Sequence, residues 1–124
     1  MGVSILKQGE YLIASIQSAL TDSEVLRLQD DLTEQVGRFR SRGVILDVSG
    51  LDVIDSFASR ALHSIALTTK LRGALAVIVG IRPEVAFAIV QLGLGLEGFH
   101  AALDLEEGLA FLNRRLERTN GRDR

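Results

Sequence analysis

The chain has 124 residues, a formal net charge of −2, two histidines and no cysteine. This length fits one domain that can bury a core without metal or disulfide staples, and the lack of cysteine excludes disulfides, thiolate nucleophiles and zinc–thiolate sites. The slightly negative charge argues against nucleic-acid binding, and neither a leader peptide nor an apolar run of ~20 residues is present. These features predict a cytoplasmic protein with a single domain at residues 1–118 and a polar C-terminal tail at residues 119–124.

Two short runs rich in β-branched residues open the chain. Val3–Gln8 and Tyr11–Ile16 flank a glycine-containing pair, which is typical of a β-hairpin. Thr21 followed three residues later by Glu24 is a capping-box signature for the start of a helix. Apolar residues then recur at helical spacing as far as about Phe39, at Val25, Leu28, Leu32, Val36 and Phe39.

The middle of the chain alternates between strand and helix patterns. Residues 44–47 and 74–79 are short apolar runs that predict buried strands. Between them, apolar residues at 58, 61, 62 and 65 predict one face of a helix from about Ser56 to Leu71.

The last third of the chain continues this alternation. Pro83 occupies a tolerated first-turn position of a helix whose apolar side is expected at Val85, Ala86, Ile89 and Val90 and whose stop is expected at Gly93. Residues 99–102 form a short candidate strand, and Asp104 with Glu107 signals another helix start. That helix would place Leu105, Leu109, Leu112 and Leu116 on one side. The predicted order ββαβαβαβα indicates an α/β fold with a mixed β-sheet and four main helices.

The loop that joins the predicted strand at 44–47 to the next helix concentrates polar chemistry. Asp47, Asp52 and Asp55 supply three carboxylates, and Ser56 stands where the helix should begin. Loops at the carboxyl ends of strands are where ligands collect in α/β proteins, and helix starts offer unpaired N–H groups and a positive dipole end. A serine there either caps the helix or accepts a phosphate, and the loop alone favours neither reading.

Other candidate sites have the wrong context. Residues 93–98 match the pattern G-x-G-x-x-G, but they follow a predicted helix, whereas a dinucleotide site follows a strand. Neither His63 nor His100 has a second histidine at metal-ligand spacing. Asp55, Ser56 and His63 could be drawn as a triad, but no nucleophile elbow is present. No catalytic residue, metal or cofactor is predicted.

Asp47 supports an alternative function. It ends a predicted buried strand, as the phosphoacceptor of a response-regulator receiver does. A receiver also needs an acidic pair after its first strand, where this chain offers Thr21-Asp22 with a single carboxylate, and a late lysine, where it offers Gly80-Ile81-Arg82. A receiver-like domain phosphorylated on Asp47 therefore stands as the second hypothesis.

Residues 44–57, Val-Ile-Leu-Asp-Val-Ser-Gly-Leu-Asp-Val-Ile-Asp-Ser-Phe, resemble the signature of STAS domains, the anti-sigma-factor antagonist family. In that family a strand, an acidic loop and a Ser or Thr at a helix start form a phosphorylatable switch. The predicted order of elements agrees with the family across nearly the whole chain. Phe57-Ala58 departs from the Ser-Gly or Thr-Gly of many antagonists, and residues 93–97 and 101–109 are most similar to the stressosome scaffold branch, the RsbS type.

The resemblance implies a protein with no enzymatic activity and no cofactor. It would co-assemble with STAS-domain paralogues of the RsbR type and hold a serine kinase of the RsbT type. Under stress the kinase would phosphorylate this protein and leave to activate a downstream pathway, and a phosphatase of the RsbX type would be a further partner. The resemblance assigns Ser56 as the phosphoacceptor, with Ser59 as a secondary candidate inside the helix. The surrounding switch residues would be Asp47, Asp52, Asp55, Phe57 and Arg60.

Overall fold

The computed structural model describes the backbone of residues 3–93 and 98–122, and side chains up to residue 117. Its elements follow the order ββαβαβαβα that the sequence predicts. The strands and helices are β1 (Val3–Gln8), β2 (Tyr11–Ile16), α1 (Asp22–Phe39), β3 (Gly43–Asp47), α2 (Ser56–Leu71), β4 (Leu75–Val79), α3 (Pro83–Gln91), β5 (Phe99–Ala102) and α4 (Leu105–Arg122).

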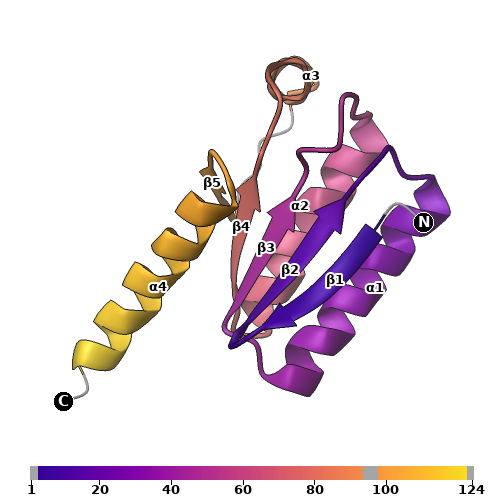
Figure 1. Cartoon of the computed structure of the whole chain (residues 1–124). Helices are drawn as coiled ribbons and strands as arrows, with labels where there is room; N and C mark the ends of the chain where they lie inside the picture. The colour runs from indigo at the N-terminus through magenta and orange to yellow at the C-terminus, as the bar shows by residue number, and fades with distance from the viewer. Residues whose placement is uncertain (1–2, 94–97, 123–124) are drawn as a thin grey trace.

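The strands form a single mixed sheet in the order β1-β2-β3-β4-β5 (Figure 1). β1 and β2 pair antiparallel as a hairpin, and β2 through β5 are parallel neighbours. Helical crossovers are the usual connections between parallel strands, and α1, α2 and α3 supply them here. This register places Asp47, at the carboxyl end of β3, between Ser15 of β2 and Val79 of β4.

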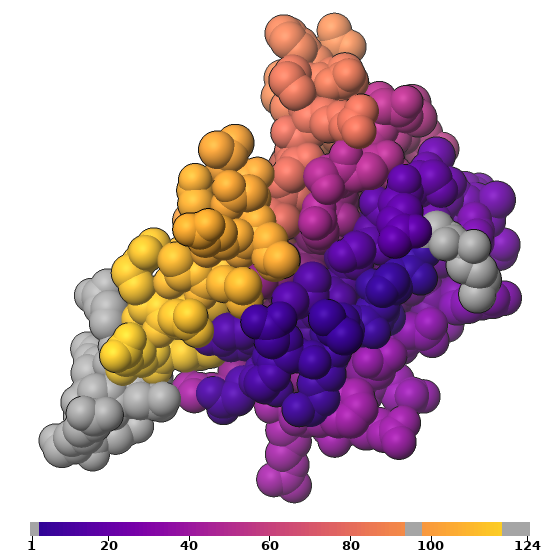
Figure 2. Space-filling view, viewed as in Figure 1, coloured from indigo at the N-terminus to yellow at the C-terminus, as the bar shows by residue number. Residues whose placement is uncertain are grey.

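Helices cover the two faces of the sheet unequally. α1 and α2 pack side by side on one face, and α4 covers part of the other, beside β3, β4 and β5 (Figure 1). Alternate residues of each strand therefore enter different clusters, Leu46 and Ile78 facing α1 and α2, and Ile45 and Val77 facing α4. Figure 2 shows the α4 side, where β1 and β2 reach the surface next to α4. Leu6 of β1 is 59% exposed.

The start of α1 has the predicted capping box. The hydroxyl of Thr21 accepts from the backbone N–H of Glu24, and the Thr21 N–H donates to the Glu24 carboxylate at 2.8 Å. That backbone hydrogen bond, with a side-chain bond from the same threonine, holds the pKa of Glu24 below its ordinary value. The apolar stripe also lies as expected, except that Phe39 at the end of the helix is partly exposed.

α3 lies beyond the carboxyl ends of the strands, at the top of Figure 1. Val85 and Ile89 enter the core as predicted, and Ala88 packs against it. The prediction that Ala86 and Val90 also face the core was wrong, because Ala86 is exposed and Val90 is 76% exposed. A helix at the end of a sheet meets the core along one narrow stripe, so apolar residues outside that stripe remain in water.

α4 confirms the predicted core position of its leucines. Leu112 is completely buried against the sheet, in a cluster with Ile45 of β3 and Val77 of β4, and Leu109 packs against this cluster. The carboxylate of Asp104 accepts from the Glu107 N–H at 2.9 Å, which is the expected cap. The helix continues to Arg122, so residues 119–122 extend it, although they were expected to form a tail. These polar residues include no proline, so none of them forces the helix to stop.

Candidate functional site

The candidate site is the β3–α2 loop, residues 48–55, together with the residues on either side of it. It leaves the sheet at Asp47, whose Oδ1 atom accepts the backbone N–H of Ser49 at 2.9 Å. The N–H of Val48 donates to the carbonyl of Val79 on β4 at 3.0 Å. Asp47, the residue on which the receiver hypothesis depends, is therefore occupied in shaping the loop.

The loop rests closely on the end of β2. A Cβ atom at Gly50 would lie 2.6 Å from the carbonyl oxygens of Ile16 and Gln17, so only glycine allows this approach. After the turn, the side chains of Leu51 and Ile54 are buried in the core shared by the sheet, α1 and α2. The buried side chains of Leu51 and Ile54 thus attach the loop to the core, while Asp52 and Val53 between them are exposed.

A second anchor comes from the start of α3. The Nε atom of Arg82 donates to the carbonyl of Ser49 at 2.8 Å. Gly80 adopts a φ of +76°, and a Cβ atom there would lie 2.8 Å from the Ser49 side chain. Sequence analysis missed Gly50, Gly80 and Arg82 as site residues because each acts through a contact far along the chain. Gly80, between β4 and α3, was the one residue whose type indicated a tight turn or a close contact at this point.

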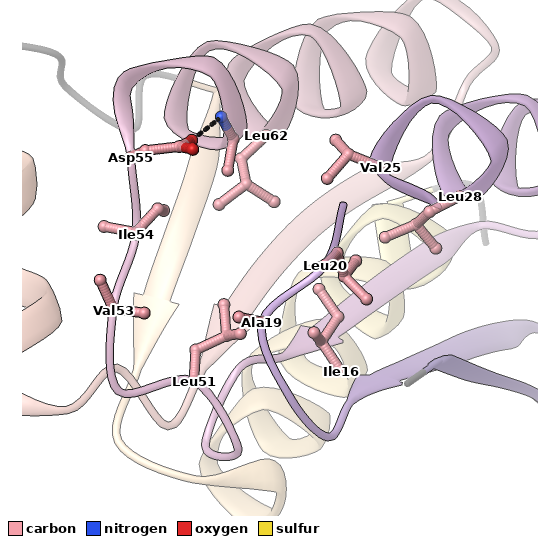
Figure 3. Close-up of a pocket in the computed structure, with 11 residues that line it drawn as sticks. Ile16, Ala19, Leu20, Val25, Leu28, Leu51, Val53, Ile54, Asp55 and Leu62 are labelled. Atoms are coloured by element: carbon pink, nitrogen blue, oxygen red, sulfur yellow. Dashed lines mark hydrogen bonds between the residues drawn. The ribbon is translucent and has the colours of Figure 1, made fainter. Parts of the chain in front are cut away.

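The N-cap of α2 is Asp55, which corrects the assignment of Ser56 as a possible cap. The Asp55 carboxylate accepts the backbone N–H of Ala58 at 2.8 Å (Figure 3). Ser56 is instead the first residue of the helix. Both residue types are good caps, but a carboxylate also gains from the positive end of the helix dipole.

The hydroxyl of Ser56 therefore does not cap the helix. The residue is half-buried, and no residue that the structure describes hydrogen-bonds to its side chain. Phe57 is half-buried beside it, and Arg60 is exposed one turn further along the helix. Backbone N–H groups of the first helical turn lack helical partners, so the surroundings of Ser56 favour an anion.

Ser59 differs from Ser56 in access. It is completely buried, its N–H donates to the carbonyl of Asp55 at 3.0 Å, and its Oγ atom has no hydrogen-bond partner among the described residues. Any enzyme that modified Ser59 would first have to unwind the start of α2. Of the two candidate serines, the geometry therefore favours Ser56.

The remaining sequence candidates that the structure describes lie outside the β3–α2 loop. In the G-x-G-x-x-G pattern, residues 94–97 lie outside the described residues. His63 lies on α2, and the ring of His100 stacks on that of Phe111 with centroids 3.6 Å apart. Within the described residues no three or more His, Asp or Glu side chains gather as metal ligands, and no helix is long and apolar enough to span a membrane.

Curated proteins with similar sequences include RsbT co-antagonists of Bacillus subtilis. RsbRA is 31% identical over 83 residues, which are 67% of this chain and 30% of RsbRA. RsbRD is 31% identical over 81 residues, which are 65% of this chain and 29% of RsbRD. The chain therefore spans less than a third of the length of these relatives.

Solved structures agree over almost the whole fold. A serine-to-glutamate variant of RsbS from Moorella thermoacetica has a TM-score of 0.81 at 34% identity, covering 94% of this chain and 97% of that one. A structure describing the molecular architecture of the stressosome has a TM-score of 0.76 at 31% identity, covering 91% and 98%. SpoIIAA, an anti-sigma factor antagonist, shares the fold at 14% identity with a TM-score of 0.72, covering 93% and 96%. The family model of the STAS domain matches residues 3–107, and the chain belongs to that family.

Proposed function

We propose that this protein is a non-enzymatic scaffold of a stressosome-type complex, switched by phosphorylation of Ser56. In its unmodified form it holds a serine kinase of the RsbT type at the β3–α2 loop. Phosphorylation by that kinase releases it to a downstream pathway, and a phosphatase of the RsbX type resets Ser56. The likeness to RsbS and to the RsbT co-antagonists supports this role.

The position of the Ser56 hydroxyl carries the proposal. The residue is half-buried, its hydroxyl has no hydrogen-bond partner among the residues that the structure describes, and the loop before it is fixed by Gly50, Arg82 and two buried side chains. A kinase must reach the hydroxyl that it phosphorylates, and the fixed loop would present Ser56 to it in one position. Because Asp55 already caps the helix, phosphate can be added to Ser56 without breaking a hydrogen bond that holds the fold.

Local electrostatics explain how the phosphate would release a bound partner. Phosphorylation adds about −1.5 to −2 charges at neutral pH. On Ser56 these would join the exposed carboxylates of Asp52 and Asp55. The helix dipole and Arg60 would stabilise the phosphate within the fold, but a partner docked flat on the loop would have to bury a dianion. Release by this route needs no large rearrangement of the scaffold.

The paralogues of the RsbR type would be the assembly partners. The relatives RsbRA, RsbRC and RsbRD match this chain over only part of their own length. The STAS domain of this chain would interleave with those larger proteins through related surfaces. We expect mixing with an RsbR-type protein to build particles larger than either component forms alone.

Site mapping tests the proposal directly. The protein is incubated with its RsbT-type kinase and ATP, and the modified residue is identified by peptide mass spectrometry. We expect one phosphate on Ser56, no incorporation in Ser56→Ala, and normal incorporation in Ser59→Ala, the matched control. Modification of Ser59 alone would refute the acceptor assignment, and an acid-labile phosphate on Asp47 would support the receiver hypothesis instead.

A further inference from the structure

An apolar pocket of about 100 Å³ lies under the β3–α2 loop. Figure 3 shows the side chains of Leu51, Ile54 and Leu62 on one side and of Leu20, Val25 and Leu28 on the other. Ala19, Val53 and Asp55 also line it, and all three are exposed, so the pocket reaches the surface. Its one charged lining residue is Asp55, and the exposed Asp52 is a near neighbour in the chain.

The size of the pocket limits what can occupy it. Pockets for cofactors and drug-sized ligands usually span roughly 300–1,000 Å³. A cavity of roughly 150 Å³ accommodates a benzene-sized group. A pocket of about 100 Å³ is therefore suited to one aliphatic side chain of a protein, with a cation beside it to meet the carboxylates at its rim.

The same chain carries a side chain of this description at the other end of α2. Leu71 is 88% exposed, more than any other large apolar residue that the structure describes. It stands between Lys70 and Arg72, both exposed. α2 has 16 residues, so its first turn and Leu71 are separated by roughly 22 Å at a rise of 1.5 Å per residue. The pocket and the exposed leucine thus lie on opposite ends of the molecule.

The packed helices α1 and α2 both carry acidic residues at their N-terminal ends and basic residues at their C-terminal ends. α1 has Asp22 and Glu24 in its first turn, with Arg38 and Arg40 at its end. α2 has Asp55 as its N-cap, Lys70 in its last turn and Arg72 as its C-cap. Since both helices follow parallel strands, their acidic ends point the same way. The starts of α1 and α2 therefore place carboxylates beside the apolar pocket, and their ends place basic side chains beside the exposed leucine.

We propose that copies of this chain bind head to tail, with Leu71 of one copy in the pocket of the next. Lys70 and Arg72 then face the carboxylates of Asp52 and Asp55 on the neighbouring copy. This contact joins two different surfaces, so each bound copy still offers a free pocket or a free Leu71. Growth by this contact is open-ended unless the rotation between copies closes a ring. The contact requires neither the kinase nor a phosphate on Ser56.

Sedimentation velocity of the purified full chain tests this contact over a wide concentration range. The weight-average mass of the wild type should rise with concentration. Leu71→Asp should raise the dissociation constant at least about tenfold, as expected for loss of a central anchor. Ala19→Phe, which fills the pocket from its exposed rim, should do the same, and Val53→Asp serves as a second pocket variant. Leu6→Asp, at an exposed leucine on β1, is the control and should associate like the wild type.

Mixing the variants distinguishes this contact from a symmetric one. Leu71→Asp keeps its pocket and Ala19→Phe keeps its leucine, so the mixture should regain one contact per pair and then stop growing. A symmetric interface formed without Leu71 of one copy in the pocket of the other would not be restored in this way. The proposal is overturned if the wild type shows no concentration dependence, if correctly folded variants associate like the wild type, or if mixing restores no complex.

Discussion

Asp55 and Ser56 are neighbours in the chain, but the structure gives their oxygen atoms different tasks. The Asp55 carboxylate closes the first turn of α2, and the Ser56 hydroxyl remains available. This separation allows the acceptor to change its charge while the helix keeps its cap.

Substitution of the two residues should separate these tasks. Asp55→Ala removes the cap and should lower the free energy of unfolding by ~0.5–2 kcal/mol. Ser56→Ala removes a hydroxyl that has no hydrogen-bond partner among the described residues, so the free energy of unfolding should change by no more than about 0.5 kcal/mol. Urea denaturation of both variants provides the comparison. A larger loss for Ser56→Ala than for Asp55→Ala would show that the serine is the true cap.

The sequence placed the N-cap of α2 one residue too late, at Ser56 and not at Asp55, and the reason for the error is local. Aspartate and serine are both preferred N-caps, so an adjacent pair leaves the helix start ambiguous by one position. The residues that hold the β3–α2 loop in place could not be predicted from the sequence, for a different reason. Gly50 meets carbonyl groups of β2, and Arg82 meets Ser49, through approaches that have no sequence pattern.

At the scale of elements, periodicity was sufficient for the strands and for the long helices. The buried runs at β3 and β4 and the stripes on α1, α2 and α4 were placed correctly, except at Phe39, because their regularly spaced apolar residues pack against the core. α3 was placed correctly, but its apolar side was overestimated at Ala86 and Val90. Composition alone cannot reveal that a helix touches the core only along a narrow stripe.

The contact of α4 with the sheet can be tested at Leu112. Its side chain is completely buried with Ile45 and Val77, and a Cβ atom at Gly43 would lie 2.7 Å from it. Leu112→Ala should therefore cost ~2–5 kcal/mol in the free energy of unfolding. Leu6→Ala, on the exposed part of the same face, should change it by no more than about 0.5 kcal/mol. Equal denaturation midpoints for the two variants would refute this placement of α4.

At the scale of the whole molecule, the fold holds the proposed phosphorylation site on a well-packed platform. The parallel strands β2, β3 and β4 bring their carboxyl ends to one edge, where buried side chains and long-range hydrogen bonds hold the β3–α2 loop. A phosphate on that edge alters the potential seen by a partner much more than it alters the fold. The same edge carries the pocket that we propose for self-association.

The affinity of the RsbT-type kinase for the protein before and after phosphorylation tests the proposed switch most directly. Isothermal titration calorimetry with the unmodified protein should show binding, and phosphorylation of Ser56 should weaken it at least about tenfold, equivalent to 1.4 kcal/mol. The difference should shrink at high salt, because screening weakens repulsion between exposed charges. Ser56→Ala should bind the kinase like the unmodified protein. Equal or tighter binding of the phosphorylated form would contradict release by charge.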